Sequence, residues 1–418
     1  MRKLRIATIG VGPSAHARSS SHIDTIVKLH DHYELCAFCD RSEQRLQEAG
    51  EAYGVKAQYT RLDSMLAQEK PDVVIRLTPK DSTVPLCLTV LEAGVHLINE
   101  IPIASTLPQA DALIDAAARN HVKMEIAENV WVWPEEQLKR RIARAGLLGT
   151  ITHGRFNYPC GTYHGLSTIR KILGCDPVRA LGIDGEHTID PSTYLDFTGR
   201  ERTLCKWEAG VFQFPGAPGE PGSINILYEM PTKGRRHVAK WEIEGTGGHL
   251  DGDALFLYRD LEEIEIPFRY DYEAVGDEQV ISRLWVDTDP LVEWINPFVS
   301  YRVGSSGGAR QYGVSGKDEI ARACILDSLY RAVVDDAEPD YGHANARKDL
   351  EAWIAVRESA WRGNQWVDLP ITELTSVEKA IHKELICRYG HDPIADREKL
   401  LETTYVRGGV LWDLLGWL

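Results

Sequence analysis

Short apolar runs alternate with amphipathic stretches over the first part of the chain. The apolar runs lie at residues 4–9, 33–39, 73–77, 95–98 and 122–126. Between them, residues 42–54, 83–92 and 107–120 have apolar positions at helical spacing. Apolar runs without polar alternation are typical of strands that are buried on both faces. The pattern therefore predicts an α/β domain over residues 1–127, with a doubly wound parallel sheet.

The pattern changes after Gly149. Longer segments with alternating polarity follow, at residues 150–158, 202–212, 223–228, 237–244 and 255–258, and helical spacing returns at 318–335 and 344–361. Alternation suits strands with one face against helices and the other in water. We predict an α+β domain over residues 128–370, with a large open, mainly antiparallel sheet that serves substrate binding and oligomerisation. The charged, partly helical residues 371–418 are expected to pack on these domains as a C-terminal extension.

Length and charge narrow the class of protein. A chain of 418 residues is long for one hydrophobic core, which favours two domains. The formal net charge of −15 argues against nucleic acid or an acidic membrane surface as a partner. No signal-like segment or run of about 18 apolar residues occurs, and the cysteines lack the spacing of a disulfide framework. We expect a cytoplasmic protein without a membrane partner.

The first predicted strand ends in a glycine turn. Gly10, Gly12 and Ala15 fit the spacing G-x-G-x-x-A, and a helix can begin at Ser14. The unpaired backbone N–H groups of such a helix start can bind a pyrophosphate when small residues allow close approach. Pro13 stiffens this turn and removes one donor. The sequence predicts a dinucleotide site at this turn.

The second predicted strand ends in an acidic residue at the position where a ribose diol is usually bound. Asp40 follows that strand, and Arg41 comes next. A carboxylate there accepts hydrogen bonds from ribose hydroxyls, whereas an arginine beside it can bind a 2′-phosphate. NAD and NADP therefore both remain open as the cofactor. The alternative is a glycine-rich turn and a capping aspartate that bind no ligand.

In order and spacing, several short motifs resemble the Gfo/Idh/MocA family of sugar and cyclitol dehydrogenases. The resemblance covers roughly residues 4–370 and rests on the glycine turn, Thr78-Pro79, Glu100-Ile-Pro102, Gly185-Glu-His187-Thr-Ile-Asp190, Glu338-Pro339 and the stretch 363–370. It implies a Rossmann domain with an open-sheet substrate domain, a small carbohydrate substrate, and a homodimer or homotetramer. The dinucleotide contacts expected from it, together with the turns above, are Gly10, Gly12, Pro13, Ser14, Ala15, Asp40, Arg41, Thr78, Pro79, Glu100, Pro102 and Asn129.

Two positions depart from the family pattern. Ile101 stands where these dehydrogenases carry the lysine of Glu-Lys-Pro, and Ile183 stands where an aspartate precedes the histidine by four residues. Of that polar catalytic set His187 remains, and an imidazole titrates near neutral pH, as an acid–base catalyst requires. A missing cation weakens stabilisation of a developing alkoxide. Ordinary dehydrogenase activity should then be slow or differently arranged.

Other polar residues near His187 in the sequence offer a second arrangement. Tyr163, His164 and Asp190 join His187 as catalytic candidates, and on a helix His187 and Asp190 would share a face. A divalent ion such as Mn, Zn or Mg could take over the role of the lysine. The metal ligands considered are His187, His164, Glu186 and Asp184. Each also has a structural interpretation: His164 could cap a loop, Asp184 and Glu186 could favour a helix start, and Asp190 could orient His187.

Three hypotheses about function follow. The first is an NAD(P)-dependent oxidoreductase that acts on a sugar, polyol or cyclitol with His187 as acid–base catalyst. The second is a non-redox lyase or glycoside-cleaving enzyme on an oxidised sugar, with a metal or a retained NAD; some relatives of this fold cleave glycosides in that way. The third is an inactive binding or regulatory module.

Overall fold

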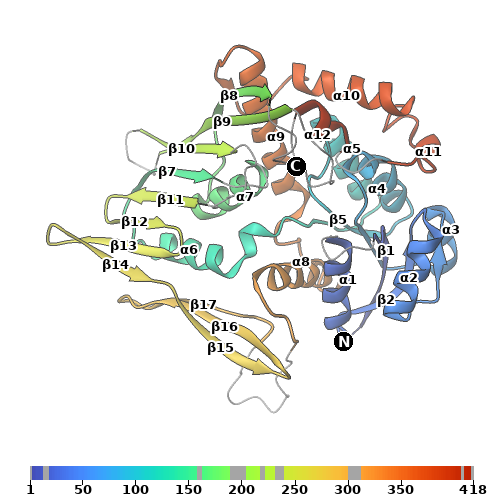
Figure 1. The fold of residues 1–418 in the computed structure, drawn as a ribbon, viewed down its shortest axis with the longest axis horizontal. Helices are drawn as coiled ribbons and strands as arrows, with labels where there is room; N and C mark the ends of the chain where they lie inside the picture. Colours follow the sequence, from blue (N-terminus) through green and yellow to red (C-terminus); the bar gives the residue numbers. More distant parts are fainter. Residues whose placement is uncertain are drawn as a thin grey trace. The chain divides into compact units, whose positions relative to one another are not determined.

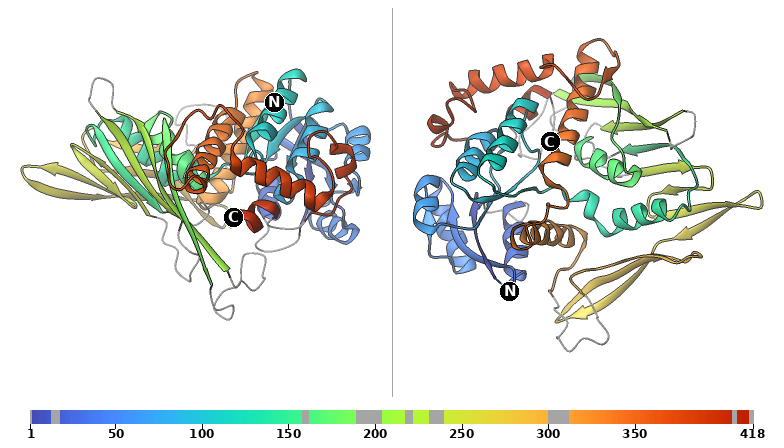
Figure 2. Two further views of the ribbon diagram at one scale, coloured as in Figure 1. Left: turned by 90° about the horizontal axis from the view of Figure 1, so that it is seen from above. Right: turned by 180° about the vertical axis from the view of Figure 1, so that it is seen from behind.

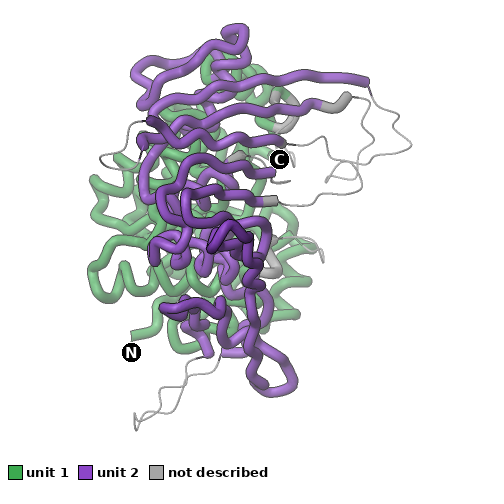
Figure 3. The backbone as a smooth tube through the Cα atoms, turned by 90° about the vertical axis from the view of Figure 1, so that its left-hand side faces the viewer, with its two compact units in different colours: residues 1–128, 322–350, 378–414 green, residues 129–321, 351–377, 415–418 purple. Residues whose placement is uncertain are grey.

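The computed structural model describes residues 2–12, 18–157, 162–188, 204–216, 222–230, 240–299, 312–405 and 409–415. The chain forms two compact units (Figure 3). Unit 1 contains residues 1–128, 322–350 and 378–414, and unit 2 contains residues 129–321, 351–377 and 415–418. Each unit combines stretches that are distant in sequence. The division into residues 1–127, 128–370 and 371–418 stays a proposal about how the domains are organised.

Unit 1 is built on a six-stranded parallel sheet (Figure 1). Its strands are β1 (Leu4–Ile9), β2 (Tyr33–Cys39), β3 (Gln58–Tyr59), β4 (Val73–Arg76), β5 (His96–Asn99) and β6 (Met124–Ile126). The order is β3-β2-β1-β4-β5-β6, and all pairs are parallel. The predicted doubly wound sheet is confirmed. The strand order reverses between β1 and β4, which is the position where such sheets bind ligands.

Helices connect these strands, and the chain later returns to the same unit. The connecting helices are α1 (Arg18–Lys28), α2 (Glu43–Tyr53), α3 (Leu62–Glu69), α4 (Thr83–Glu92) with the short η1 (Lys80–Ser82) before it, and α5 (Leu107–Arg119). The returning helices are α8 (Lys317–Val334), the start of α9 (Gly342–Trp361), α10 (Ser376–Tyr389), α11 (Arg397–Leu400) and α12 (Gly409–Leu415). Ser42 accepts a hydrogen bond from the Arg45 N–H and so caps α2, and Gly54 ends this helix with a left-handed φ of 70°.

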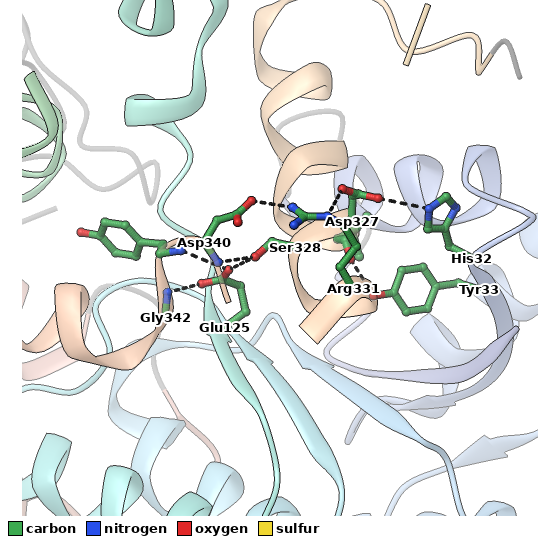
Figure 4. A network of polar contacts seen from close by, with 10 residues as sticks. His32, Tyr33, Glu125, Asp327, Ser328, Arg331, Asp340 and Gly342 are labelled. Atoms are coloured by element: carbon green, nitrogen blue, oxygen red, sulfur yellow. Dashed lines mark hydrogen bonds and ion pairs between the residues drawn. The ribbon is translucent and has the colours of Figure 1, made fainter. Parts of the chain in front are cut away.

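A buried carboxylate joins the sheet of unit 1 to the returning helices (Figure 4). Glu125 of β6 accepts hydrogen bonds from the Gly342 N–H at 2.7 Å and from the Ser328 hydroxyl. The Ser328 hydroxyl in turn accepts from the Asp340 N–H at 2.8 Å. Burial raises the pKa of Glu125 to about 7, although the surrounding donors favour its carboxylate. One side chain thus satisfies the first N–H of α9 and fixes α8.

Unit 2 contains a nine-stranded sheet and a separate three-stranded sheet. The large sheet has the order β14-β13-β12-β11-β7-β10-β9-β8-β18, and its strand pairs are antiparallel except for β7 with β10. The predicted open, mainly antiparallel sheet is confirmed. Its strands are β7 (Ile151–Asn157), β8 (Arg179–Thr188), β9 (Leu204–Pro215), β10 (Ser223–Met230), β11 (Lys240–Gly245), β12 (Gly248–Asp251), β13 (Ala254–Arg259), β14 (Glu262–Pro267) and β18 (Val367–Asp368). The smaller sheet comprises β15 (Arg269–Val275), β16 (Glu278–Val286) and β17 (Val292–Ile295).

One face of the large sheet carries a buried row of aromatic rings. The rings of Phe212 and Tyr228 are stacked with their centroids 5.2 Å apart, and Phe156 stacks on Trp241 at 5.6 Å. Helix α7 (Thr162–Leu173) lies against one face of the large sheet (Figure 2). It packs against the aromatic row through Gly165, where a Cβ atom would lie 2.3 Å from the Phe156 ring. The unit also contains α6 (Pro134–Arg144) and the short η2 (Val130–Val132). The close helix–sheet contact fixes the start of α7.

Candidate functional site

The turn after β1 requires a glycine at its first position. Gly10 has a φ of +92°, and a Cβ atom there would lie 2.9 Å from Cγ2 of Thr78. Its N–H donates to the Cys39 carbonyl at 2.8 Å, so the turn leaves the sheet beside the end of β2. A larger residue would be strained and would fill the space beside Thr78. Gly12 belongs to the described turn, whereas Pro13, Ser14 and Ala15 lie outside the described residues.

Asp40 connects this turn to helix α2. Its Oδ2 accepts the Val11 N–H at 3.0 Å, and its Oδ1 accepts the Ser42 N–H at 3.0 Å. A carboxylate oxygen has two lone pairs, so both oxygens keep acceptor capacity for a ribose diol. Arg41 is exposed beside it. The fixed carboxylate and the close-approach glycine both fit a dinucleotide.

A fully buried arginine connects two of the predicted cofactor segments, and sequence reasoning missed it. Arg76, at the end of β4, is 1% exposed. Its guanidinium donates to the Thr78 carbonyl at 2.7 Å, to Asn99 Oδ1 at 2.6 Å and to the Glu100 carbonyl at 2.8 Å. Burial lowers the pKa of Arg76. The only signal in the sequence is a charged residue inside an apolar strand, and it does not identify the partners.

Glu100 is held from the helix that follows the glycine turn. Its Oε1 lies 2.8 Å from Nε2 of His22 in α1, and its Oε2 accepts the Ile101 N–H at 3.2 Å. The side chains of Glu100, Ile101 and Pro102 are buried. Thr78, next to half-buried Pro79, shares a hydrogen bond of 2.6 Å with the Ser82 hydroxyl. These contacts place Thr78 and Glu100 at the carboxyl edge of the sheet that also carries Gly10 and Asp40.

Asn129 lies in unit 2 and has a partner there. Its side-chain amide donates to Asp318 Oδ1 at 3.2 Å, and the indole N–H of Trp133 donates to the same oxygen at 2.9 Å. Asp318 belongs to the first turn of α8. The carboxylate thus orders the segment that begins at Asn129, which is half-buried.

His164 and Tyr163 lie in the first turn of α7 and are both buried. Their rings meet edge to face with centroids 6.5 Å apart. The His164 carbonyl accepts hydrogen bonds from the hydroxyls of Ser167 at 2.8 Å and Thr168 at 3.2 Å. His164 is therefore buried within a packed helix start.

His187 lies at the exposed end of strand β8, so the helical arrangement considered for it does not occur within residues 179–188. This segment is extended because β8 pairs with β9 along its whole length. Gly182 lets the chain at Val356 approach the strand closely, since a Cβ atom there would lie 2.0 Å from the Val356 carbonyl oxygen. Neighbouring residues of a strand point to opposite faces, so the side chains of Glu186 and His187 diverge. Asp190 lies outside the described residues.

The structure does not group the four proposed metal ligands. Asp184, Glu186 and His187 are exposed along β8, whereas His164 is buried in α7. Within the described parts of the chain, no three His, Cys, Asp or Glu side chains gather as a metal ion requires.

The described parts of the chain also contain no helix with the length and apolarity needed to span a membrane.

The part of the chain that forms the parallel sheet of unit 1 matches the model of a known protein family. Residues 4–128 match the model described as "Oxidoreductase family, NAD-binding Rossmann fold", GFO_IDH_MocA. The resemblance inferred from the glycine turn and the short motifs is therefore confirmed over the Rossmann part of the chain.

Named relatives match a part of the chain. The α-N-acetylgalactosaminidase of Shewanella oneidensis is 32% identical over 168 residues, which are 38% of this chain and 35% of that protein. The D-apiose dehydrogenase of Paraburkholderia graminis is 34% identical over 128 residues, 31% of this chain and 34% of the enzyme. The chain thus spans about a third of the length of the relatives that it matches.

Solved structures extend the similarity in fold to most of the chain. An oxidoreductase from Thermotoga maritima aligns with a TM-score of 0.62 at 18% identity, over 88% of this chain and 98% of that one. The WlbA dehydrogenase from Bordetella pertussis, in complex with NADH and UDP-GlcNAcA, aligns with a TM-score of 0.59 at 17% identity, over 88% of this chain and all of that one. These similarities show that the fold is shared over most of the chain.

Proposed function

We propose that this chain is an NAD(P)-dependent enzyme that acts on a sugar, polyol or cyclitol by hydride transfer. The observation that carries the proposal is the carboxyl edge of the parallel sheet, where Gly10 allows close approach and Asp40 presents a fixed carboxylate. This edge lies within the part of the chain that matches an NAD-binding family. A bound nicotinamide would supply the hydride acceptor or donor.

Each residue of this edge has a defined role in holding the dinucleotide. The turn at Gly10 and Gly12 would receive the pyrophosphate, and Asp40 would accept hydrogen bonds from the ribose hydroxyls. Arg41 would meet the 2′-phosphate of NADP. The segments at Thr78-Pro79 and Glu100-Pro102 would bind the nicotinamide end, because Arg76 and His22 hold them in place.

We assign the acid–base role to His164 in preference to His187. An acid–base catalyst must be held in a defined geometry, and exclusion of water strengthens its interactions. His164 is 2% exposed at the packed start of α7, whereas His187 is exposed on β8. Tyr163, buried beside His164, would help to orient the imidazole. Ile101 stands where the related dehydrogenases have a lysine that assists proton transfer. The His164 imidazole would therefore be the main group that carries the proton.

The test is the variant His164→Gln with a panel of polyols and reduced sugars. We expect nicotinamide reduction to fall about 100-fold or more, because general acid–base catalysis typically contributes 10²–10⁴-fold. His153→Gln, on β7, is the matched control at an exposed position and should keep full activity. Full activity in His164→Gln would contradict the assigned role. A panel in which the unmodified protein changes no nicotinamide absorbance would contradict the hydride-transfer proposal itself.

A second candidate function is glycoside cleavage with a retained cofactor. It is supported by the 32% identity to an α-N-acetylgalactosaminidase and by the loss of the lysine at position 101. In such a reaction the hydride returns to the sugar, so no net NADH accumulates. Release of p-nitrophenol from p-nitrophenyl glycosides, without net NADH, would favour this candidate. Net NADH formation on a free polyol would favour the first.

A further inference from the structure

The C-terminal part of unit 1 is attached to the loop that follows β4. Asp81 comes two residues after Pro79 and is 6% exposed. Its carboxylate accepts the Tyr389 hydroxyl at 2.7 Å and the Val410 N–H at 3.0 Å. Gly409 has a φ of +64°, and a Cβ atom there would lie 2.3 Å from Asp81 Oδ1. Helix α12 therefore begins directly on the Asp81 carboxylate.

This attachment brings a second tyrosine to the same place. The ring of Tyr405 lies with its centroid 5.0 Å from that of Tyr389, and the Tyr405 hydroxyl donates to the Leu400 carbonyl at 2.9 Å. Burial raises the pKa of Tyr405, and the negative charge of Asp81 raises it further, whereas Arg41 lowers it. The phenol therefore stays neutral, and its ring lies within electrostatic reach of both Asp81 and Arg41.

The sheet order shows where such a ring must lie. β2 and β4 are the two neighbours of β1, so Arg41 follows one flanking strand and Asp81 follows the segment after the other. Neighbouring strands are about 4.8 Å apart, which places the ends of β2 and β4 about 10 Å from each other. The Gly10 turn leaves β1 between them. Because Tyr389 is hydrogen-bonded to Asp81 and its ring lies beside that of Tyr405, the Tyr405 ring lies at the carboxyl edge, on the β4 side of this turn.

We propose that Tyr405, supported by Tyr389, forms the outer wall of the adenosine end of the dinucleotide site, where its ring stacks on the adenine. This inference rests on the proposed function. The adenosine end is indicated because Asp40 and Arg41 form the ribose-binding side of the edge. A neutral aromatic ring suits this position, since a base stacks on it and it does not repel the diphosphate.

The experiment measures calorimetrically the binding of NADH, ADP-ribose and reduced nicotinamide mononucleotide to the full chain. In Tyr405→Ala we expect NADH and ADP-ribose to bind about tenfold more weakly, and the mononucleotide to bind unchanged, because loss of stacking on a base typically weakens binding by that order. Tyr405→Phe keeps the ring and should bind all three like the unmodified chain. Tyr272→Ala, on β15, is the control for loss of an exposed tyrosine.

Several results would overturn the inference, and they differ from failure of the proposed function. Unchanged or tighter NADH binding in Tyr405→Ala would mean that the ring does not form a wall of the site. Equal weakening for ADP-ribose and the mononucleotide would mean that the segment only stabilises unit 1. If Tyr405→Ala does not fold, weakened ADP-ribose binding in the folded Tyr405→Phe would likewise contradict stacking. Absence of NADH binding by the unmodified chain would refute the proposed function instead.

Discussion

Two regions contain residues that the sequence analysis proposed for function: the carboxyl edge of the parallel sheet and the far end of β8. The two regions differ in how strongly hydrogen bonds and burial fix these residues. At the edge, both carboxylate oxygens of Asp40 accept backbone hydrogen bonds, and the Glu100 carboxylate is hydrogen-bonded to the His22 ring. At the end of β8, His187 is exposed, and the Glu186 carboxylate lies 3.9 Å from the Lys206 ammonium.

The difference indicates which polar residues can perform chemistry. Burial of a polar group costs free energy unless its hydrogen bonds are satisfied, so a buried network is retained only where its members fix one another. A fixed group keeps its geometry when a ligand arrives, which is the condition for strong binding and catalysis. We therefore expect function to depend on the edge of unit 1 far more than on the end of β8.

The largest expected effect comes from the centre of the edge. Arg76→Met removes the donor to Asn99 Oδ1 and to the carbonyls of Thr78 and Glu100. An unsatisfied buried acceptor costs about 1–3 kcal/mol, so we expect a loss of about 4 kcal/mol in the free energy of unfolding. NADH binding should fall with it, because both nicotinamide segments lose their support. Urea denaturation and NADH titration measure the two effects.

Arg179→Met is the matched control for this variant. Arg179 lies over the Trp366 ring at 4.5 Å and is half-buried in unit 2. It also donates to Gln213 Oε1 at 2.7 Å. Its loss should cost about 2 kcal/mol or less and leave NADH affinity unchanged. If Arg76→Met lost no more stability than this control and still bound NADH normally, the contrast between the two regions would not hold.

Much of the edge could be predicted from the sequence because its signals are local. Continuous apolar runs identified the parallel strands: residues 33–39 coincide with β2, and residues 73–77 contain β4. Asp40 follows a strand directly, so its position at the edge is a consequence of chain order alone. The turn after β1 needs a residue with positive φ at position 10, and the glycine that allows this is visible in the sequence.

The remainder depends on contacts between distant residues. Arg76 is satisfied by Thr78, Asn99 and Glu100, which lie at the ends of two different strands, β4 and β5, and no periodicity shows this arrangement. A helix is only one of the arrangements considered at His187, and Gly182 and Gly185 already disfavour it. The extended conformation follows from the pairing of β8 with β9, which only the folded chain reveals.

Glu125 is as buried as the residues at the carboxyl edge, but it has no predicted role in ligand binding. It is therefore a useful comparison for them. Its pKa is raised from 4.5 to about 7. Between these two pH values the folded chain therefore keeps a proton on Glu125 that the unfolded chain has released. Stability is therefore highest below about pH 4.5 for this group and falls as the pH rises to about 7. The shift corresponds to about 3 kcal/mol.

The variant Glu125→Gln isolates this contribution because an amide keeps the shape but does not titrate. Urea denaturation of both proteins at about pH 5 and about pH 8 gives the difference in their free energies of unfolding. We expect the unmodified chain to lose up to about 3 kcal/mol relative to the variant over that interval. A constant difference would show that Glu125 remains ionised throughout, so that the Ser328 and Gly342 donors outweigh burial.

The smallest effect is expected at the end of β8. His187→Ala removes an exposed imidazole from a strand end, and substitutions at such positions usually change stability by about 0.5 kcal/mol or less. NADH affinity and turnover should also stay within about twofold of the unmodified chain, since this side chain is exposed at the end of the strand. The assay is the polyol panel used for His164→Gln. Loss of turnover in His187→Ala with full NADH affinity would move the acid–base role to β8, because it would show that an exposed imidazole there is recruited when substrate binds.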